Sequence, residues 1–303
     1  MMNVPTDNVG VLSAMSTQMA DAVERVGQSL VMVNGRQRQS ASGVVYAPNT
    51  ILTADHVLER EEDLTIETPD QRKLPAKFVG RDSATDLAVL EVPDLGLDPA
   101  TTADEARVGQ LVLAVGRPTS DGPMASLGIV SAMGGPVRTQ RGAMLEQYIR
   151  TDATPYPGFS GGPLTSTDGT VLGIVTTGLV GGVALAIPSP IAWRIAETLT
   201  QHGTVKRGFL GLSCQPVPLP DQYRQGREQE RGLLVVRVED GSPAEKGGVL
   251  LGDVIITLDG NTLNDTDDLQ ALLTGNRVGQ AVPMEVVRGG TPQTLQVTIG
   301  QRK

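Results

Sequence analysis

Residues 158–180 read GFSGGPLTSTDGTVLGIVTTGLV, and this stretch decides the fold. Glycines crowd both sides of Ser160, as a tight turn that exposes a nucleophilic serine requires, although a plain glycine-rich hairpin would read the same way. Gly158, Ser160 and Gly162 also match the Gly-x-Ser-x-Gly pattern of α/β-hydrolases, in which a helix directly follows the serine. Here Pro163 and the turn at 165–169 lead into an apolar strand, which favours a β-rich fold.

Short apolar runs extend from this stretch in both directions, from Leu30 to about Ile187, and turn residues separate them. This pattern is typical of an all-β barrel or sandwich. Helices are predicted on both sides of it. Met15, Met19, Val23 and Val26 recur at a helical period. After the strands, Ser189 is expected to cap the start of a helix that has Pro190 at its first position, and Gly203 is expected to end it.

A second, smaller unit follows, with its own strands and one clear helix. Asp265 is expected to cap this helix, because Asp268 stands three residues later in a variant of the capping box. Leu269, Leu272 and Leu273 would then form its buried face.

Composition excludes several classes of protein. The chain has 303 residues, two histidines, one cysteine and a net charge of −9. These numbers exclude a three-histidine metal site, a zinc ribbon and an iron–sulfur cluster, and they argue against a nucleic-acid partner. We therefore expect no metal, no cofactor and no nucleic acid.

Two segments bear on membranes and location. The uncharged stretch 170–193 is interrupted by two glycines at 181–182 and by Pro188 and Pro190, so it predicts two buried strands and not a membrane span. The first 26 residues have no positive region followed by an apolar run. The sequence therefore predicts a cytoplasmic protein, or an exported one if the chain is a piece of a longer protein.

Two further residues join Ser160 in a candidate constellation. His56 ends an apolar strand, and Asp86 directly precedes another, where a carboxylate in a low dielectric can orient an imidazole. His202 stands near a helix end and is explained by the helix dipole and solvent. The order His56, Asp86, Ser160 is that of chymotrypsin and differs from that of α/β-hydrolases.

The segments TADHV (53–57), DSATDLAVLEV (82–92) and TDATPYPGFSGGPL (151–164) resemble the HtrA (Deg) family of trypsin-like serine proteases. GLLVVRVEDGSPAEKGGVLLGDVIITLDG (232–260) resembles the core of that family's PDZ domain. The resemblance implies a mainly β fold, a chymotrypsin-like double β-barrel followed by an α+β PDZ domain. The domains would be an N-terminal helix and tail at 1–28, a protease domain at 29–203 and a PDZ domain at 204–303.

The resemblance also implies roles for the residues of the first domain. Ser160 would be the nucleophile, His56 the general base and acid, and Asp86 the residue that orients His56. The backbone N–H groups of Gly158 and Ser160 would form the oxyanion hole. A strand with the small apolar residues Ala184, Leu185 and Ala186 would line the specificity pocket, which implies cleavage after small or medium aliphatic residues. Phe159 replaces the family's usual asparagine, and we expect this ring to be exposed or to line the substrate pocket.

The second domain would bind the C-terminus of a peptide as an added strand. Its binding residues would be Gly208, Phe209, Leu210, Gly211, Leu212, Leu269 and Leu272. The implied function is ATP-independent endoproteolysis of unfolded or damaged proteins in protein quality control. A catalytically latent PDZ scaffold or chaperone is the alternative. The family also implies a homotrimer, although its usual aromatic contacts are missing because no aromatic residue precedes Tyr46.

Overall fold

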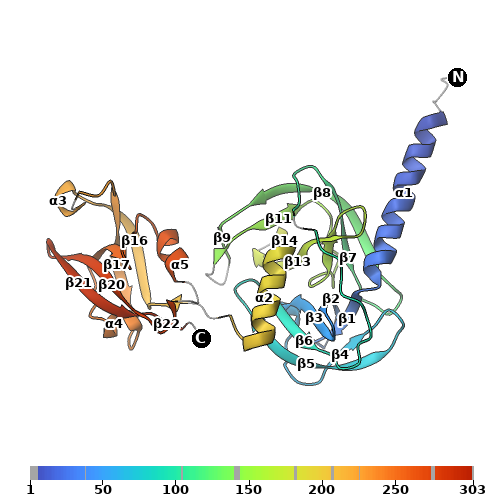
Figure 1. The fold of residues 1–303 in the computed structure, drawn as a ribbon, viewed down its shortest axis with the longest axis horizontal. Coiled ribbons are helices and arrows are strands. Elements are labelled where there is room, and N and C mark those ends of the chain that lie inside the picture. Colours follow the sequence, from blue (N-terminus) through green and yellow to red (C-terminus); the bar gives the residue numbers. More distant parts are fainter. Residues whose placement is uncertain are drawn as a thin grey trace. The chain divides into compact units, whose positions relative to one another are not determined.

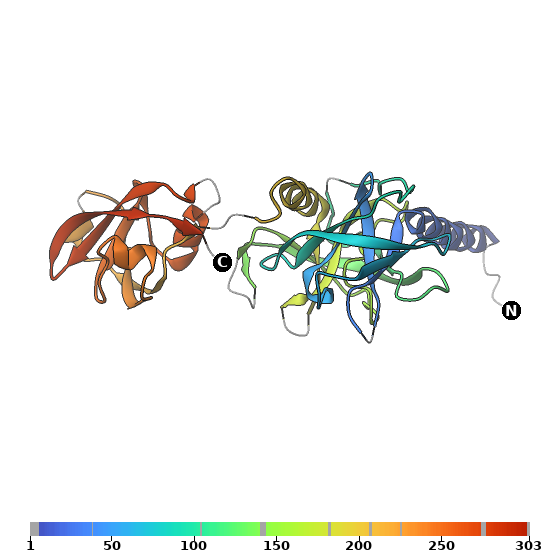
Figure 2. The ribbon, with the colours of Figure 1, turned by 90° about the horizontal axis from the view of Figure 1, so that it is seen from below.

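The computed structural model divides the chain into two compact units, Met1–Val205 and Lys206–Lys303. Figures 1 and 2 show the elements of each unit in two views. The structure describes residues 6–37, 39–103, 105–139, 144–180, 183–205, 208–224, 226–273 and 277–301.

Two closed antiparallel β-barrels form the first unit, which confirms the predicted double barrel. The first barrel has the order β1-β2-β3-β6-β5-β4, with β1 (Leu30–Asn34), β2 (Ala41–Ala47), β3 (Thr50–Ala54), β4 (Leu64–Glu67), β5 (Lys73–Asp82) and β6 (Leu87–Glu91). The second has the order β11-β14-β13-β12-β7-β8, with β7 (Leu111–Gly116), β8 (Met124–Gly134), β11 (Tyr148–Thr151), β12 (Pro163–Thr165), β13 (Val171–Val180) and β14 (Val183–Pro188). A two-stranded sheet of β9 (Val137–Arg138) and β10 (Met144–Leu145) lies outside them.

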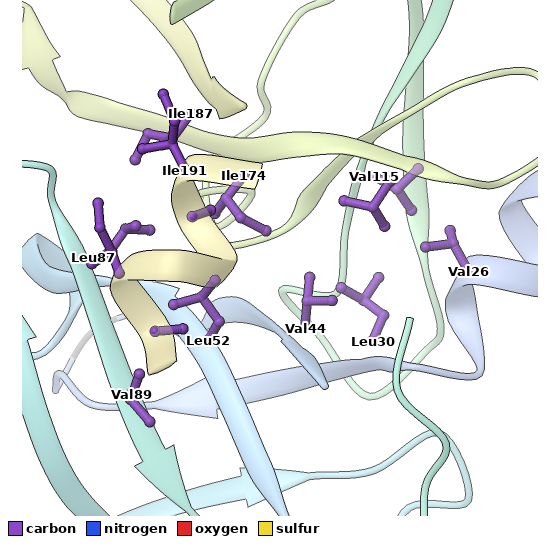
Figure 3. Packing of buried hydrophobic residues seen from close by; sticks show 14 of the residues in the cluster. Val26, Leu30, Val44, Leu52, Leu87, Val89, Val115, Ile174, Ile187 and Ile191 are labelled. Carbon is purple, nitrogen blue, oxygen red and sulfur yellow. The ribbon is translucent and has the colours of Figure 1, made fainter. Parts of the chain in front are cut away.

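Apolar side chains from both barrels meet in one shared core, which we call the seam. Leu52 and Leu87 come from the first barrel, and Ile174 and Ile187 come from the second. All four are fully buried and belong to the same cluster as Ile191 of helix α2 (Ser189–His202) (Figure 3). Burial of this apolar surface is the main force that holds the two barrels together.

The two ends of α2 agree with the sequence prediction to different degrees. Gly203 adopts a left-handed conformation (φ 71°), and its N–H donates to the Leu199 carbonyl, which confirms the predicted end. The prediction that Ser189 caps the start is wrong, because Pro188 occupies the cap position. The Ser189 hydroxyl instead donates to the Ala103 carbonyl at 2.7 Å.

Strands β13 and β14 account for most of the uncharged stretch at 170–193, and they pair as an antiparallel hairpin. No helix in the described part of the chain is both long enough and apolar enough to span a membrane. Helix α1 (Thr6–Gly27) begins the chain as predicted. Its last turns pack into the seam through Ala22 and Val26, whereas Val11 and Leu12 are exposed.

The second unit is an antiparallel sheet with short helices. The sheet order is β16-β17-β18-β20-β21, with β19 beside β18, and the strands are β16 (Leu212–Pro218), β17 (Arg231–Val238), β18 (Val254–Leu258), β19 (Asn261–Thr262), β20 (Ala281–Arg288) and β21 (Thr291–Thr298). A second pair joins β15 (Gly208–Phe209) to β22 (Gly300–Gln301). The helices are α3 (Asp221–Arg224), α4 (Pro243–Lys246) and α5 (Thr266–Leu272). The capping box of Asp265 and Asp268 at the start of α5 is confirmed.

Candidate active site

His56 and Asp86 are brought together at one end of the first barrel. His56 lies in the short 3₁₀ turn η1 (Asp55–Val57) that directly follows β3, and Asp86 directly precedes β6. The His56 Nδ1 atom lies 2.6 Å from Asp86 Oδ2, and the His56 amide donates to Asp86 Oδ1 at 2.9 Å. Asp86 is only 1% exposed, so its carboxylate meets the imidazole away from bulk water.

Strand β13 of the second barrel closes the other side of this pair. The Thr176 hydroxyl donates to Asp86 Oδ2. Gly178 lies so close that a Cβ atom added to it would come within 2.7 Å of both Asp86 Oδ2 and His56 Nδ1. Sequence reasoning missed both residues. The polar pair Thr176–Thr177 inside an otherwise apolar strand was the available signal.

A second buried carboxylate lies directly before His56 in the chain. Asp55 Oδ1 forms an ion pair at 3.0 Å with Arg81 Nη1, and Asp55 Oδ2 accepts from the Ser83 hydroxyl at 2.6 Å. Arg81 also pairs with Glu61 at 3.0 Å. The negative charge of Asp55 beside His56 is therefore paired with the positive charge of Arg81. The same ion pair fixes η1 to β5.

Ser160 enters the same region from the second barrel but is not bonded to His56. Its Oγ atom lies 3.3 Å from the Thr177 hydroxyl. No hydrogen bond joins Ser160 to His56 among the described residues. Catalytic hydrogen bonds are often long or misaligned without substrate, so this arrangement is compatible with a resting site.

Glycines shape the loop that carries Ser160. Gly158 and Gly161 have positive φ angles of 89° and 85°, which glycine adopts without strain. A side chain at Gly161 would also collide with the Ser42 carbonyl at 2.2 Å. The N–H groups of Gly158 and Ser160 have no acceptor within the described part of the chain. Two amides are therefore free to bind an oxygen beside the Ser160 hydroxyl.

Phe159 is placed differently from the sequence expectation. Its side chain is 0% exposed and lies in the core of the second barrel with Ile149 and Leu164. The ring packs edge-on against Tyr156, with centroids 5.4 Å apart. The prediction that Phe159 contacts substrate is therefore wrong. The ring is buried because the loop turns it inward beneath Ser160.

The predicted specificity strand is only partly accessible. It lies in β14, where Ala184 is half-buried. Leu185 and Ala186 are buried, and Ala186 belongs to the core of the second barrel. Of the three residues, only Ala184 has substantial surface for a ligand.

Most of the predicted peptide-binding residues of the second unit surround one small cavity of about 60 Å³. Its lining residues are Gly208, Phe209, Leu210, Gly211, Leu212, Glu239, Leu269, Gln270 and Leu273. Leu272 is not among them, whereas Leu273, directly after α5, lines the cavity. Sequence reasoning missed Glu239 and Gln270, which add polar side chains to the lining of this cavity.

The fold and the arrangement around His56 define a trypsin-like serine protease domain followed by a PDZ domain. Residues 41–174 match the trypsin-like peptidase domain, and residues 208–299 match the PDZ domain. The solved structure of the HtrA-type protease AlgW with tripeptide superposes with a TM-score of 0.76 at 31% identity, covering 94% of this chain and 97% of that one. The serine endoprotease from Yersinia pestis gives a TM-score of 0.79 at 28% identity, covering 94% and 98%. The chain belongs to the HtrA family of serine proteases.

Sequence relatives agree with this assignment. A probable periplasmic serine endoprotease, DegP-like, from Ectopseudomonas mendocina (strain ymp) is 36% identical over 277 residues, which is 88% of this chain and 58% of the relative. A DegP-like relative from Halomonas elongata is 34% identical over 293 residues, which is 91% of this chain and 61% of the relative. The chain thus spans about three fifths of the length of the curated relatives it matches.

The names of these relatives also correct the expected location. They are described as periplasmic, so the expectation of a cytoplasmic protein is wrong. That expectation rested on the composition of the first 26 residues, and the point at which a sequence begins does not determine a compartment.

Proposed function

We propose that this chain is a serine endopeptidase that hydrolyses peptide bonds with His56, Asp86 and Ser160. The observation that carries the proposal is the 2.6 Å contact between His56 Nδ1 and the buried Asp86 carboxylate, beside the glycine-rich Ser160 loop. Paired His and Asp side chains in this geometry are the part of a catalytic triad that prepares a serine for attack.

The mechanism begins at the imidazole. Nδ1–H donated to Asp86 leaves the lone pair on Nε2, which takes the Ser160 proton as Oγ attacks the carbonyl carbon. Asp86 then stabilises the imidazolium, and His56 returns the proton to the leaving amine. Water repeats the sequence on the acyl-enzyme and releases the acid product. The Thr176 hydroxyl holds Asp86 in place through both halves of the reaction.

The oxyanion of each tetrahedral intermediate would be bound by the N–H groups of Gly158 and Ser160. Their lack of acceptors among the described residues supports this role. Donors fixed in advance stabilise charge as it develops, and losing one typically lowers the rate by about 10²–10³-fold.

The substrates we propose are unfolded or damaged polypeptides, cleaved without ATP after small or medium aliphatic residues. Support for the preference comes from β14, where Ala184 offers a small apolar surface. The periplasmic location of the relatives is extended to this chain as part of the proposal.

The PDZ domain would bind the C-termini of peptides in the cavity between β15, β16 and α5. The N–H groups of Leu210 and Gly211 have no backbone acceptor in the described part of the chain, so they can receive a carboxylate. The AlgW structures hold a tripeptide and a decapeptide, which supports peptide binding by relatives. A homotrimer remains a proposal from the family alone, and sedimentation velocity would measure it.

A latent scaffold or chaperone is the second candidate, and one observation favours it. Ser160 Oγ is paired with Thr177 and not with His56, so the resting constellation is incomplete. Under this alternative, peptide binding would dominate and cleavage would be absent.

A fluorophosphonate probe separates the two candidates. The endopeptidase should label at Ser160 and cleave unfolded casein, and Ser160→Ala and His56→Ala should lose both activities. Digestion of an unfolded proteome, with and without a peptide that binds the PDZ domain, should give cleavage after aliphatic residues. If neither labelling nor cleavage is seen under either condition, the latent scaffold or chaperone is the supported function. Dominant cleavage after Lys or Arg would refute the proposed specificity.

A further inference from the structure

Ser42 on β2 lies directly behind the loop that carries Ser160. Its side chain is fully buried. The Ser42 hydroxyl donates to the Gly158 carbonyl at 2.7 Å, and the Ser42 amide donates to the Ser160 carbonyl at 3.2 Å. One residue of the first barrel therefore binds the carbonyls of both residues whose amides face the proposed oxyanion.

Ser42 is itself held from two other directions. Its hydroxyl accepts from the Arg117 amide at 2.8 Å, and its carbonyl accepts from the Thr53 hydroxyl at 2.7 Å. The first bond leaves the hydroxyl proton directed at Gly158. The second fixes the carbonyl that Gly161 closely approaches. The Ser42 hydroxyl thus has one defined donor and one defined acceptor. A methyl group in its place could form neither hydrogen bond.

The loop needs such an external restraint. Glycine has more backbone freedom than any other residue, so nothing within Gly158 keeps it at a φ of 89°. A rotation of the backbone at Gly158 would turn its N–H away from the position of the oxyanion. Fixing its carbonyl at a buried hydroxyl limits that rotation.

We propose that Ser42 is a positioning residue for the oxyanion hole, acting through the carbonyls of Gly158 and Ser160. This inference rests on the proposed endopeptidase function. Ser42 touches neither substrate nor the reacting atoms. It would act by holding two amides in the geometry that favours the tetrahedral intermediate, so its removal should lower kcat more than it raises KM.

Ser189 supplies a matched control. Its hydroxyl is also buried and also donates to a backbone carbonyl, that of Ala103, at the same distance of 2.7 Å. Ser42→Ala and Ser189→Ala therefore both remove a hydroxyl-to-carbonyl hydrogen bond from the same unit, and Ser42→Ala also removes the bond from the Arg117 amide. Only the first touches the Ser160 loop.

The experiment compares the full-length wild type, Ser42→Ala and Ser189→Ala with an aliphatic peptide substrate, a peptidyl boronic acid and thermal unfolding. Ser42→Ala should lower kcat by about 10-fold or more and weaken boronate binding by a similar factor, because the boronate oxygen occupies the oxyanion hole. Ser189→Ala should keep kcat and boronate affinity within about twofold. Ser42→Thr, which keeps the hydroxyl, should recover most of the lost kcat.

Three results would overturn the inference. One is an unchanged kcat in Ser42→Ala. Another is an equal loss of activity in both alanine variants that tracks their unfolding, since this would indicate a purely structural role. The third is a wild type that shows no Ser160-dependent cleavage, which refutes the proposed function as well and is thereby distinguished from the first two.

Discussion

Replacing Phe159 by alanine removes a fully buried ring from the core of the second barrel, one residue before the proposed nucleophile. Deletions of this kind destabilise proteins by about 3–5 kcal/mol. Loss of the edge-on contact with Tyr156 contributes about 0.5–1.5 kcal/mol of that total. For a unit of this size, each kcal/mol lowers Tm by about 2–4 °C, so the first unit should melt about 6–20 °C earlier.

Differential scanning calorimetry of the full chain measures this shift, and fluorophosphonate labelling below the new Tm reports the state of the loop. Phe159→Leu, which keeps most of the volume, should lose only about 1–2 kcal/mol. Tyr156→Ala removes the partly exposed partner ring and should lose about 0.5–1.5 kcal/mol. If the alanine variant kept its Tm within about 2 °C and changed KM or cleavage preference instead, the ring would face substrate and the reasoning would fail.

Three further predictions concern single groups. Thr176→Val removes a hydrogen bond to the Asp86 carboxylate, and bonds to charged groups contribute about 1.5–3 kcal/mol, so kcat/KM should fall roughly 10–100-fold in steady-state assays. An unchanged kcat/KM would contradict this. Gly178→Ala places a Cβ atom 2.7 Å from His56 Nδ1 and should abolish fluorophosphonate labelling, whereas normal labelling would exclude the packing described here. Burial raises the pKa of the Cys214 thiol to about 11. Because the thiolate is the reactive form and is scarce at pH 8, native Cys214 should react with a disulfide reagent about 100-fold more slowly than in denaturant. Equal rates would refute the burial.

The fold followed from the sequence because its signals are local. The turn after Ser160, at residues 165–169, leads into β13 and thereby excludes the helix of an α/β-hydrolase. Gly203 also predicted the C-terminus of α2, and Asp265 predicted the N-terminus of α5, since caps depend on neighbouring residues. Ser189 is not the cap because Pro188 occupies that position, and the Ser189 hydroxyl bonds instead to Ala103, which lies 86 residues away in the chain.

The site was harder to predict where it depends on contacts between distant strands. Local motifs suggested His56, Asp86 and Ser160, and their order in the chain favoured the chymotrypsin arrangement, but nothing near Phe159 in the sequence shows that its ring turns inward. The contact of Ser42 with Gly158 spans 116 residues and joins two barrels, so no local pattern could reveal it. Residues that support a site are set by topology, and these are the ones that the sequence analysis missed.

The division of the site between two barrels has a consequence for how such an enzyme can evolve. His56 and Asp86 belong to the first barrel, and Ser160 belongs to the second, so the apolar seam sets the distance between the proposed base and the proposed nucleophile. A methyl group gained or lost at Leu52 or Ile174 would move one half of the site relative to the other while leaving every polar group intact. Selection can therefore adjust the reaction rate through the volume of core side chains, at positions that a search for catalytic residues would pass over.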